Sequence, residues 1–136
     1  MKIFADTGAW IGLLVASDVN HGKARSAFSR FLAERALVVT SNYVIDETIT
    51  WLRYHVSHKA AVAFRETLTE ARAAHGLHVE WVSERIEGEA WDIFLKYADH
   101  ELSFTDCTSA VIARELGLVV WAYDRDFATL GFQLIG

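Results

Sequence analysis

The chain has 136 residues, of which 52% are hydrophobic and 23% charged, and its formal net charge is −5. This length fits one domain covering residues 1–136, with enough apolar material for a sizeable core, so an intrinsically disordered chain is excluded. The negative charge argues against a broad basic nucleic-acid surface, and the single cysteine, Cys107, excludes a disulfide framework and suits a reducing cytoplasm.

The predicted elements alternate between short apolar strands and helices. We expect strands at 2–5, 37–39, 78–82, 118–122 and 133–135. We expect helices at 7–16, 21–35, 43–55, 58–75, 83–99, 105–116 and 126–130. Gly76 and Gly117 suit helix ends, and Ser83 suits a helix start. Apolar strands separated by helices predict a three-layer α/β/α sandwich with a mostly parallel central sheet.

The first of these elements could be mistaken for a secretory signal, because Lys2 precedes a largely apolar stretch that reaches Ala16. Asp6 interrupts that stretch, and its basic end is a single lysine. No segment reaches the roughly 18 consecutive apolar residues that a membrane span needs. We therefore expect a cytoplasmic protein with no membrane association.

Two of the predicted strands end in aspartate. Asp6 follows the strand at 2–5, and Asp124 follows the strand at 118–122, with Asp126 two residues later. In open α/β sheets the carboxyl ends of the strands form the ligand crevice, so this pattern predicts an acidic, metal-binding site. Taken singly, Asp6 and Asp124 could instead be helix N-caps.

Two further acids lie in predicted helices. Asp106 stands three residues after Ser103 and could be the acidic half of a capping box. Glu47 could be an ordinary solvent-facing residue, but Trp51 lies one helical turn later on the same face, which suggests burial. A buried carboxylate needs a partner. The neighbouring Asp46 points about 100° away around the helix and should not join the same cluster.

The order and spacing of these segments resemble the PIN-domain nucleases, particularly the VapC-type toxins of prokaryotic toxin-antitoxin pairs. The similarity runs almost end to end. It rests on Asp6-Thr7, the run 43–47, the run 102–110 with 113–117, and the run 124–127 followed by Gly131-Phe132. One position departs from the pattern, since the last strand of this family often carries threonine where this chain has Ala122.

This resemblance implies a metal-dependent endoribonuclease whose catalytic acids bind one or two Mg²⁺ or Mn²⁺ ions. The matching acids are Asp6, Glu47, Asp106 and Asp124, with Asp126 as an auxiliary ligand. Thr7, Thr105 and Arg125 are candidate substrate-binding residues, and Arg114 is a further candidate that could equally be a surface residue. Two carboxylates about 5 Å apart repel by roughly 3 kcal/mol at an effective dielectric near 20, so four converging acids need protons or cations. Oxygen ligands suit both metals.

The resemblance also implies partners: single-stranded or looped RNA as substrate, a cognate VapB-like antitoxin, and a second copy in a homodimer. Trp51, Tyr54 and Phe64 could supply an apolar dimer face, or they could be core residues. Two alternatives stay open. One is a catalytically silent PIN fold that acts as an RNA-binding or protein-interaction module, for which an eroded acidic set would be diagnostic. The other is a Toprim-like phosphotransfer domain, whose early acid is normally glutamate.

Overall fold

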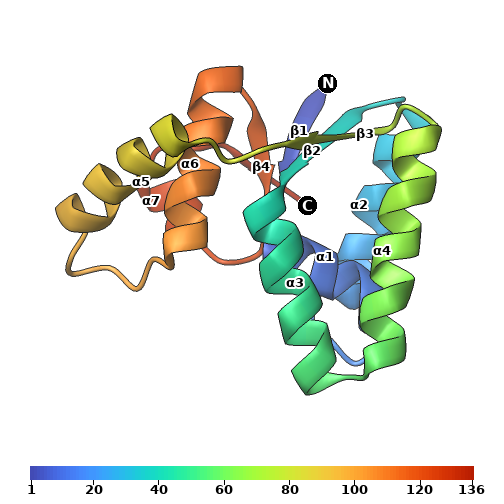
Figure 1. Ribbon diagram of the computed structural model, residues 1–136. Helices are drawn as coiled ribbons and strands as arrows, with labels where there is room; N and C mark the ends of the chain where they lie inside the picture. Colours follow the sequence, from blue (N-terminus) through green and yellow to red (C-terminus); the bar gives the residue numbers. More distant parts are fainter.

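The computed structural model describes all residues from 1 to 136 (Figure 1). Five parallel strands form one sheet in the order β3-β2-β1-β4-β5. The strands are β1 (Lys2–Ala5), β2 (Leu37–Ser41), β3 (Leu77–Glu80), β4 (Val119–Trp121) and β5 (Leu134–Ile135). The helices are α1 (Thr7–Leu14), α2 (His21–Ala33), α3 (Asn42–His55), α4 (His58–Ala73), α5 (Glu84–Lys96), α6 (Phe104–Leu116) and α7 (Asp126–Thr129). The predicted α/β/α architecture is confirmed.

The helices divide into two groups, with α1 to α4 on one side of the sheet and α5 to α7 on the other (Figure 1). The chain runs outward from β1 to β2 and β3, then returns across the sheet to β4 and β5. Right-handed crossovers in opposite directions place their helices on opposite faces. The direction changes between β1 and β4, and a crevice at the carboxyl ends of the strands is expected at such a switch point.

Aromatic side chains fill the core between the sheet and the first helix group. The ring of Trp10 lies 5.7 Å from that of Phe64 and 5.9 Å from that of Trp121, measured between centroids. Phe64 is 0% exposed, so its predicted place in a dimer face is wrong and its core alternative is right. The indole N–H of Trp10 donates to the hydroxyl of Thr40 (3.3 Å), which donates to the carbonyl of Ala5 (3.1 Å). These bonds tie α1 and β2 to the end of β1, next to Asp6.

Serine side chains begin four of the helices. The hydroxyls of Ser41, Ser57, Ser83 and Ser103 each accept a backbone N–H from the first turn that follows. Gly117 adopts a left-handed conformation with φ of 65° and ends α6, as predicted. At the end of α4 the left-handed residue is His75, with φ of 60°, and not the predicted Gly76. The helix expected at 83–99 already ends at Lys96. No helix combines the length and apolar character needed to cross a bilayer.

Candidate active site

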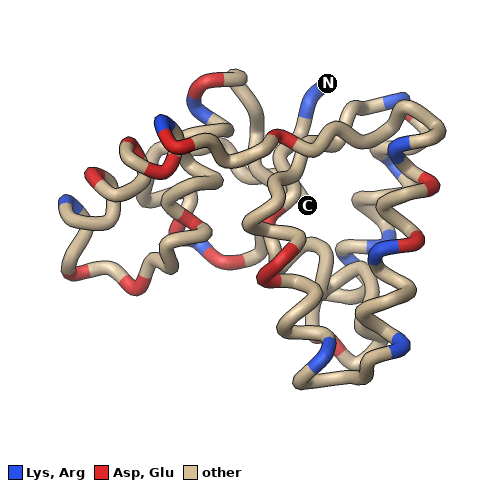
Figure 2. The backbone as a smooth tube through the Cα atoms, viewed as in Figure 1, with Lys and Arg blue, Asp and Glu red and all other residues tan.

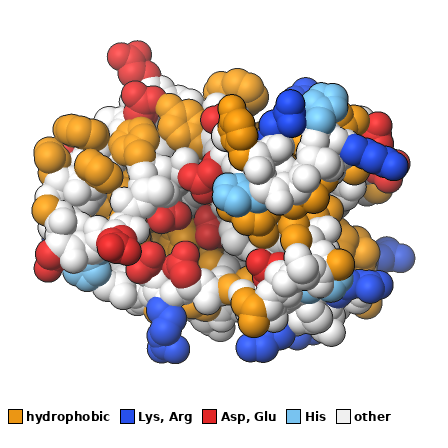
Figure 3. Space-filling model, turned by 90° about the horizontal axis from the view of Figure 1, so that it is seen from below, with side chains coloured by type: hydrophobic (Ala, Val, Ile, Leu, Met, Phe, Trp, Pro, Cys, Tyr) orange, Lys and Arg blue, Asp and Glu red, His pale blue; other side chains and the backbone are white.

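Acidic residues from four separate segments converge at the carboxyl ends of β1 and β4. Asp6 directly follows β1, Asp124 comes three residues after β4, Glu47 lies in the second turn of α3, and Asp106 lies in the first turn of α6. Figure 2 shows acidic positions on α3, on α6 and on the chain segments between them. Seen from the carboxyl ends of the strands, Asp and Glu side chains surround a hollow in the middle of the molecule (Figure 3).

Asp6 is the most deeply buried of these acids, with 4% of its surface exposed. Register places it opposite the end of β4, since its N–H donates to the carbonyl of Trp121 (3.1 Å). It stands at the N-cap position of α1, yet its side chain makes no capping bond, so the capping alternative does not explain it. Its Oδ1 has no hydrogen-bond partner. A buried, unpartnered carboxylate oxygen is costly unless a proton or a cation compensates it.

The surroundings of Asp6 raise the pKa of its carboxyl well above the usual value. Burial is the largest cause, followed by the negative charge of Asp106, while the backbone of Thr7 lowers the pKa in part. The charges of Asp124 and Glu47 raise it further. All four predicted acids therefore share one electrostatic environment. The structure brings this set together from segments up to 118 positions apart, as Asp6 and Asp124 are.

Asp106 has two roles at once. Its Oδ2 accepts the N–H of Ser103 (3.0 Å), and the Ser103 hydroxyl accepts the N–H of Asp106 (3.0 Å), so the predicted capping-box alternative is confirmed. Burial nevertheless raises the pKa of Asp106 to about 6, with further contributions from the charges of Asp124 and Glu47 and opposing ones from Ser103. The capping box thus holds the side chain in place without removing its carboxylate from the acidic cluster.

Glu47 and Asp46 are neighbours on α3 that differ in burial and in their effect on the other acids. Ser41 caps the helix through the N–H of Val44 (3.1 Å), which sets the start of the helix and hence the direction of each side chain. Glu47 is half-buried and its charge acts on Asp6 and Asp106, whereas Asp46 is exposed and acts on neither. The predicted distinction between these neighbours holds. The sequence suggested that the face of Glu47 and Trp51 is buried. In the structure both residues are half-buried and border a groove that Thr105 also lines.

The segment after β4 makes its own turn. Asp124 Oδ1 accepts the N–H of Asp126 (2.9 Å), which closes a local turn before α7. The N-cap position of α7 belongs to Arg125, so Asp124 is not that cap. Asp126 is half-buried, and it is not among the causes of the raised pKa of Asp6 or of Asp106. Its auxiliary role therefore stays a prediction.

The candidate substrate-binding residues lie at different depths. Thr7 is buried, and its hydroxyl has no hydrogen-bond partner. Thr105 is half-buried and lines the groove together with Glu47. Arg125 is exposed and forms no ion pair. Arg114 instead lies over the ring of Phe132, 5.8 Å from its centroid, in a different pocket, so it is better explained as a surface residue.

The chemistry of the acidic set suits a hard divalent cation. Asp6 offers a buried oxygen without a donor, and the neighbouring carboxylates are all oxygen ligands. As they stand, no three His, Cys, Asp or Glu side chains are arranged closely enough to hold an ion directly. Mg²⁺ needs no such cage, since it usually keeps several waters and binds through one or two carboxylates. The residues present therefore fit Mg²⁺ held partly through water.

Two aromatic side chains of α3 lie beside Glu47, in a place that the sequence did not predict. Trp51 and Tyr54 were expected in a dimer face or the core, but they line a cavity of about 350 Å³ together with Glu47, Thr105 and His55. Their spacing from Glu47, four and seven residues, puts them on the same side of α3. That spacing could have suggested their position beside the acids.

Comparison with known proteins agrees with this geometry. The PIN domain family model matches residues 3–133. The 23S rRNA-specific endonuclease VapC20 of Mycobacterium tuberculosis is 35% identical over 131 residues, which cover 96% of this chain and 95% of that protein. A VapC ribonuclease of Archaeoglobus fulgidus is 27% identical over 130 residues, covering 94% of this chain and 80% of that protein.

Solved structures match in the same way. The crystal structure of M. tuberculosis VapC20, described as a sarcin-ricin loop cleaving toxin, superimposes with a TM-score of 0.82 at 36% identity and covers 96% of this chain and 95% of its own. VapBC-1 from nontypeable Haemophilus influenzae gives a TM-score of 0.68 at 18% identity, over 99% of this chain and 97% of that chain, which shows the shared fold. Fold, acidic set and sequence lead to one conclusion: the chain belongs to the PIN domain family, among its VapC-type members.

Proposed function

We propose that this protein is an endoribonuclease of the VapC type, the toxin of a toxin-antitoxin pair, and that residues 1–136 form its single catalytic domain. The observation that carries the proposal is Asp6. Its carboxylate is buried, its Oδ1 has no hydrogen-bond donor, and the charges of three other acids from separate elements act on it. A fold that only packs or only binds RNA has no use for such an arrangement, because each buried charge costs stability.

In this proposal Asp6, Glu47, Asp106 and Asp124 hold Mg²⁺ or Mn²⁺, as one or two ions, with Asp126 as an auxiliary ligand. When bound, the metal would activate water as a nucleophile and stabilise the charge that develops on the phosphate. The protein holds the carboxylates in position. The capping box with Ser103 holds Asp106, and the turn to Asp126 holds Asp124. Neutralising this acidic set also removes its repulsion of the RNA backbone.

Residues around the acids would place the RNA strand. Thr7 has a free hydroxyl next to Asp6, and Thr105 lies beside Glu47 in the groove. Arg125 is exposed between two acids, where its guanidinium can reach a phosphate of the substrate. These three residues are our candidates for substrate contacts.

The relatives suggest which RNA to try first. VapC20 of M. tuberculosis is a 23S rRNA-specific endonuclease, and its alignment with this chain is nearly complete. We therefore propose a structured loop of ribosomal RNA as substrate, because a loop can present one unpaired phosphate to a narrow crevice. A VapB-like antitoxin and a second copy of the chain are the proposed protein partners in the cytoplasm.

Two alternatives are less well supported. A catalytically silent PIN fold would be expected to have lost some of its acids, but all four are present and share one environment. A Toprim-like domain does not account for the PIN match, which takes up residues 3–133.

The test is cleavage of an RNA hairpin with the sequence of the sarcin-ricin loop, and of whole 23S rRNA, by purified protein with Mg²⁺, with Mn²⁺ and with EDTA. Asp6→Asn serves as the inactive variant, and Asp46→Asn as a matched control of equal charge change. We expect metal-dependent cuts with the parent and the control but none with Asp6→Asn. Cuts that persist in EDTA, or in Asp6→Asn, would refute the metal site.

A further inference from the structure

An aromatic surface of α3 lies next to Glu47 of the acidic set. Glu47, one of the four acids, and Thr105, next to Asp106 in the chain, line a cavity that is completed by Trp51, Tyr54 and His55, with Asp46 and Thr50 at its edge. Its volume of about 350 Å³ is large enough for a nucleobase. We propose that Trp51, Tyr54 and His55 form a subsite that binds the base of a nucleotide next to the cleaved phosphate; this inference rests on the proposed function.

The helix itself aligns this subsite with the catalytic acids. Trp51 follows Glu47 by four residues and His55 follows Trp51 by four, so the three side chains stand one above another along α3. The rings of Trp51 and His55 stack with centroids 4.4 Å apart and planes 11° from parallel. If an RNA strand places a phosphate beside Glu47, the neighbouring base reaches this flat aromatic surface one helical turn away, ~5 Å along the helix axis.

A backbone contact holds the stacked pair in place. His55 Nδ1 lies 3.0 Å from the carbonyl oxygen of Trp51. A carbonyl only accepts hydrogen bonds, so Nδ1 carries the proton and donates it. The other ring nitrogen, Nε2, stays free to bind a polar edge of a ligand. The ring orientation is thus set before any ligand arrives, which lowers the entropic cost of binding.

Exposure and charge favour a base over other ligands. Tyr54 is 82% exposed, and its hydroxyl has no hydrogen-bond partner in the structure. Asp46 and Glu47 border the cavity, so a phosphate would be repelled there, whereas a neutral, flat base would not. Stacking on aromatic side chains is the usual way in which proteins bind unpaired bases.

The test uses RNA binding in an Asp6→Asn background, with the cleavable hairpin as probe. Trp51→Leu and Tyr54→Ala should each weaken binding by about 5- to 150-fold, which is the range for losing one stacked base. The salt dependence of Kd should not change, because no phosphate contact is removed. Trp81→Ala is the matched control, since Trp81 is 71% exposed and lies outside this groove.

A second measurement assigns the contact to a base. An abasic nucleotide placed next to the cut should weaken binding to the parent but should cause no further loss in Trp51→Leu. If Trp51→Leu and Tyr54→Ala bind like Trp81→Ala, the subsite is refuted. If instead they convert a dimer into monomers, this face is an interface between two copies and the base-binding proposal is wrong.

Failure of the subsite can be separated from failure of the proposed function. A parent protein that cuts RNA with metal, together with variants that bind normally, would overturn only the subsite. A parent that neither binds nor cuts RNA would overturn both. Circular dichroism melts of each variant check that Trp51→Leu remains folded, and Tyr54→Ala probes the same surface through an exposed side chain with little effect on packing.

Discussion

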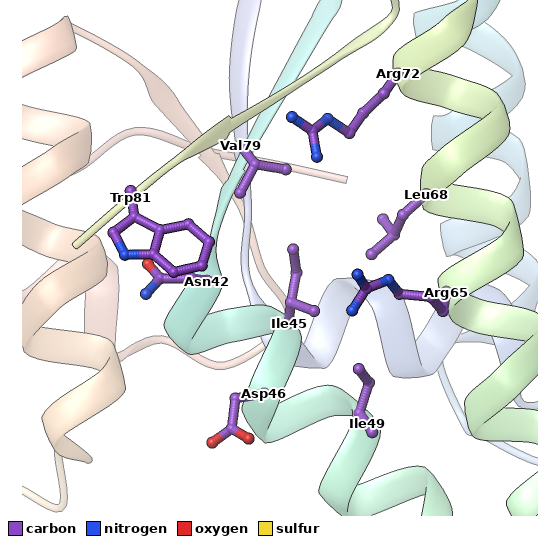
Figure 4. Close-up of a pocket in the computed structure, with 9 residues that line it drawn as sticks. All are labelled: Asn42, Ile45, Asp46, Ile49, Arg65, Leu68, Arg72, Val79 and Trp81. Atoms are coloured by element: carbon purple, nitrogen blue, oxygen red, sulfur yellow. The ribbon is translucent and has the colours of Figure 1, made fainter.

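The two sides of α3 carry opposite kinds of site. One side presents Glu47, Trp51 and His55 to the acidic groove. The other side presents Asn42, Ile45 and Ile49 to α4 and forms a pocket of about 280 Å³ with Arg65, Arg72, Leu68, Val79 and Trp81 (Figure 4). Asp46 borders both. In Figure 4 the guanidinium groups of Arg65 and Arg72 extend from α4 toward Ile45 and Val79, into the space between α4 and α3.

This difference shows that the cost of an unpaired charge depends more on its burial than on its sign. Arg65 and Arg72 form no ion pair, but both are exposed, so water stabilises their charges at little cost. Asp6 also lacks a partner, but it is buried among other acids, and its pKa rises well above the usual value. The arginine pocket can remain empty without a penalty. Repulsion among the carboxylates destabilises the acidic site, and a bound cation would reduce that repulsion.

The largest effect should come from Asp6→Asn. We expect RNA cleavage to fall roughly 100-fold or more, because the change removes the most buried charge from the proposed metal site. At pH 7 to 8 without metal, the same variant should be more stable than the parent by about 1–3 kcal/mol, because one repelling, unpartnered charge is gone. Cleavage kinetics and urea denaturation measure the two effects. If Asp6→Asn stays active, or if it is less stable than the parent without metal, the buried charge on the acidic side of α3 is not the costly feature that separates the two sides.

The next largest effect tests the contrast within α3 itself. Glu47→Gln should reduce cleavage about 10- to 100-fold, whereas Asp46→Asn, with the same change of charge, should stay within about threefold of the parent. Of these two residues, only Glu47 is among the causes of the raised pKa of Asp6 and of Asp106. Initial rates on one RNA hairpin under identical metal conditions decide the matter. Equal losses in the two variants would mean that general acidity, and not the direction of the side chain, sets the activity.

The pH dependence of stability should also distinguish the acidic side of α3 from the arginine side. Asp106 has a folded-state pKa of about 6, raised from 3.8, and that of Asp6 is raised as well. A raised carboxyl pKa contributes stability that is fully present below the unfolded pKa and is lost as pH rises through the folded pKa. Without metal, we expect these groups to cost on the order of 1–3 kcal/mol of unfolding free energy between about pH 4 and 7. Melts across this range in EDTA measure it.

Saturating Mg²⁺ or Mn²⁺ provides the control for that experiment. Bound cations should raise the melting temperature at pH 7 and flatten the pH dependence, because they keep the carboxylates ionised at less cost. A pH profile that is the same with and without metal would contradict the coupling between the acids and a cation. Asp6→Asn should show a smaller response to pH and to metal than the parent.

The smallest effect is expected on the arginine side. Arg65→Gln and Arg72→Gln should each change the unfolding free energy by no more than about 0.5 kcal/mol, since both side chains are exposed and unpaired. Cleavage should stay within about twofold of the parent. Chemical denaturation and the same hairpin assay provide the measurement. A large loss of cleavage would show that RNA extends around α3 to this pocket.

Much of the fold could be predicted from local patterns. The strand 2–5, the helix beginning after Ser83 and the stop at Gly117 all follow from short-range rules of apolar runs, caps and turns. The errors are also local in origin. Gly76 looked like the C-cap of α4, but the chain closes its last turn through His75, which tolerates a left-handed conformation.

The acidic set and its family pattern were visible in the sequence, but the state of each acid was not. The chain order of Asp6, Glu47, Asp106 and Asp124 indicated one site, and Asp46 was separated from Glu47 by helical geometry alone. By contrast, the spacing of Ser103 and Asp106 predicted the capping box, but nothing local to Asp106 reveals that its carboxylate is also buried beside the charge of Asp124. Helical spacing places Trp51 and Tyr54 on the side of Glu47, but only the tertiary structure shows that both line a cavity there.

The sequence by itself determined the strands, helices and carboxylates of this protein, because periodicity, capping and residue type act over a few neighbouring positions. Only the tertiary structure decided which carboxylate is buried without a partner, which side of α3 faces the acids, and that Phe64 belongs to the core. Burial and electrostatic coupling depend on what distant segments bring against a side chain. The switch in strand order between β1 and β4 is the feature that brings those segments together.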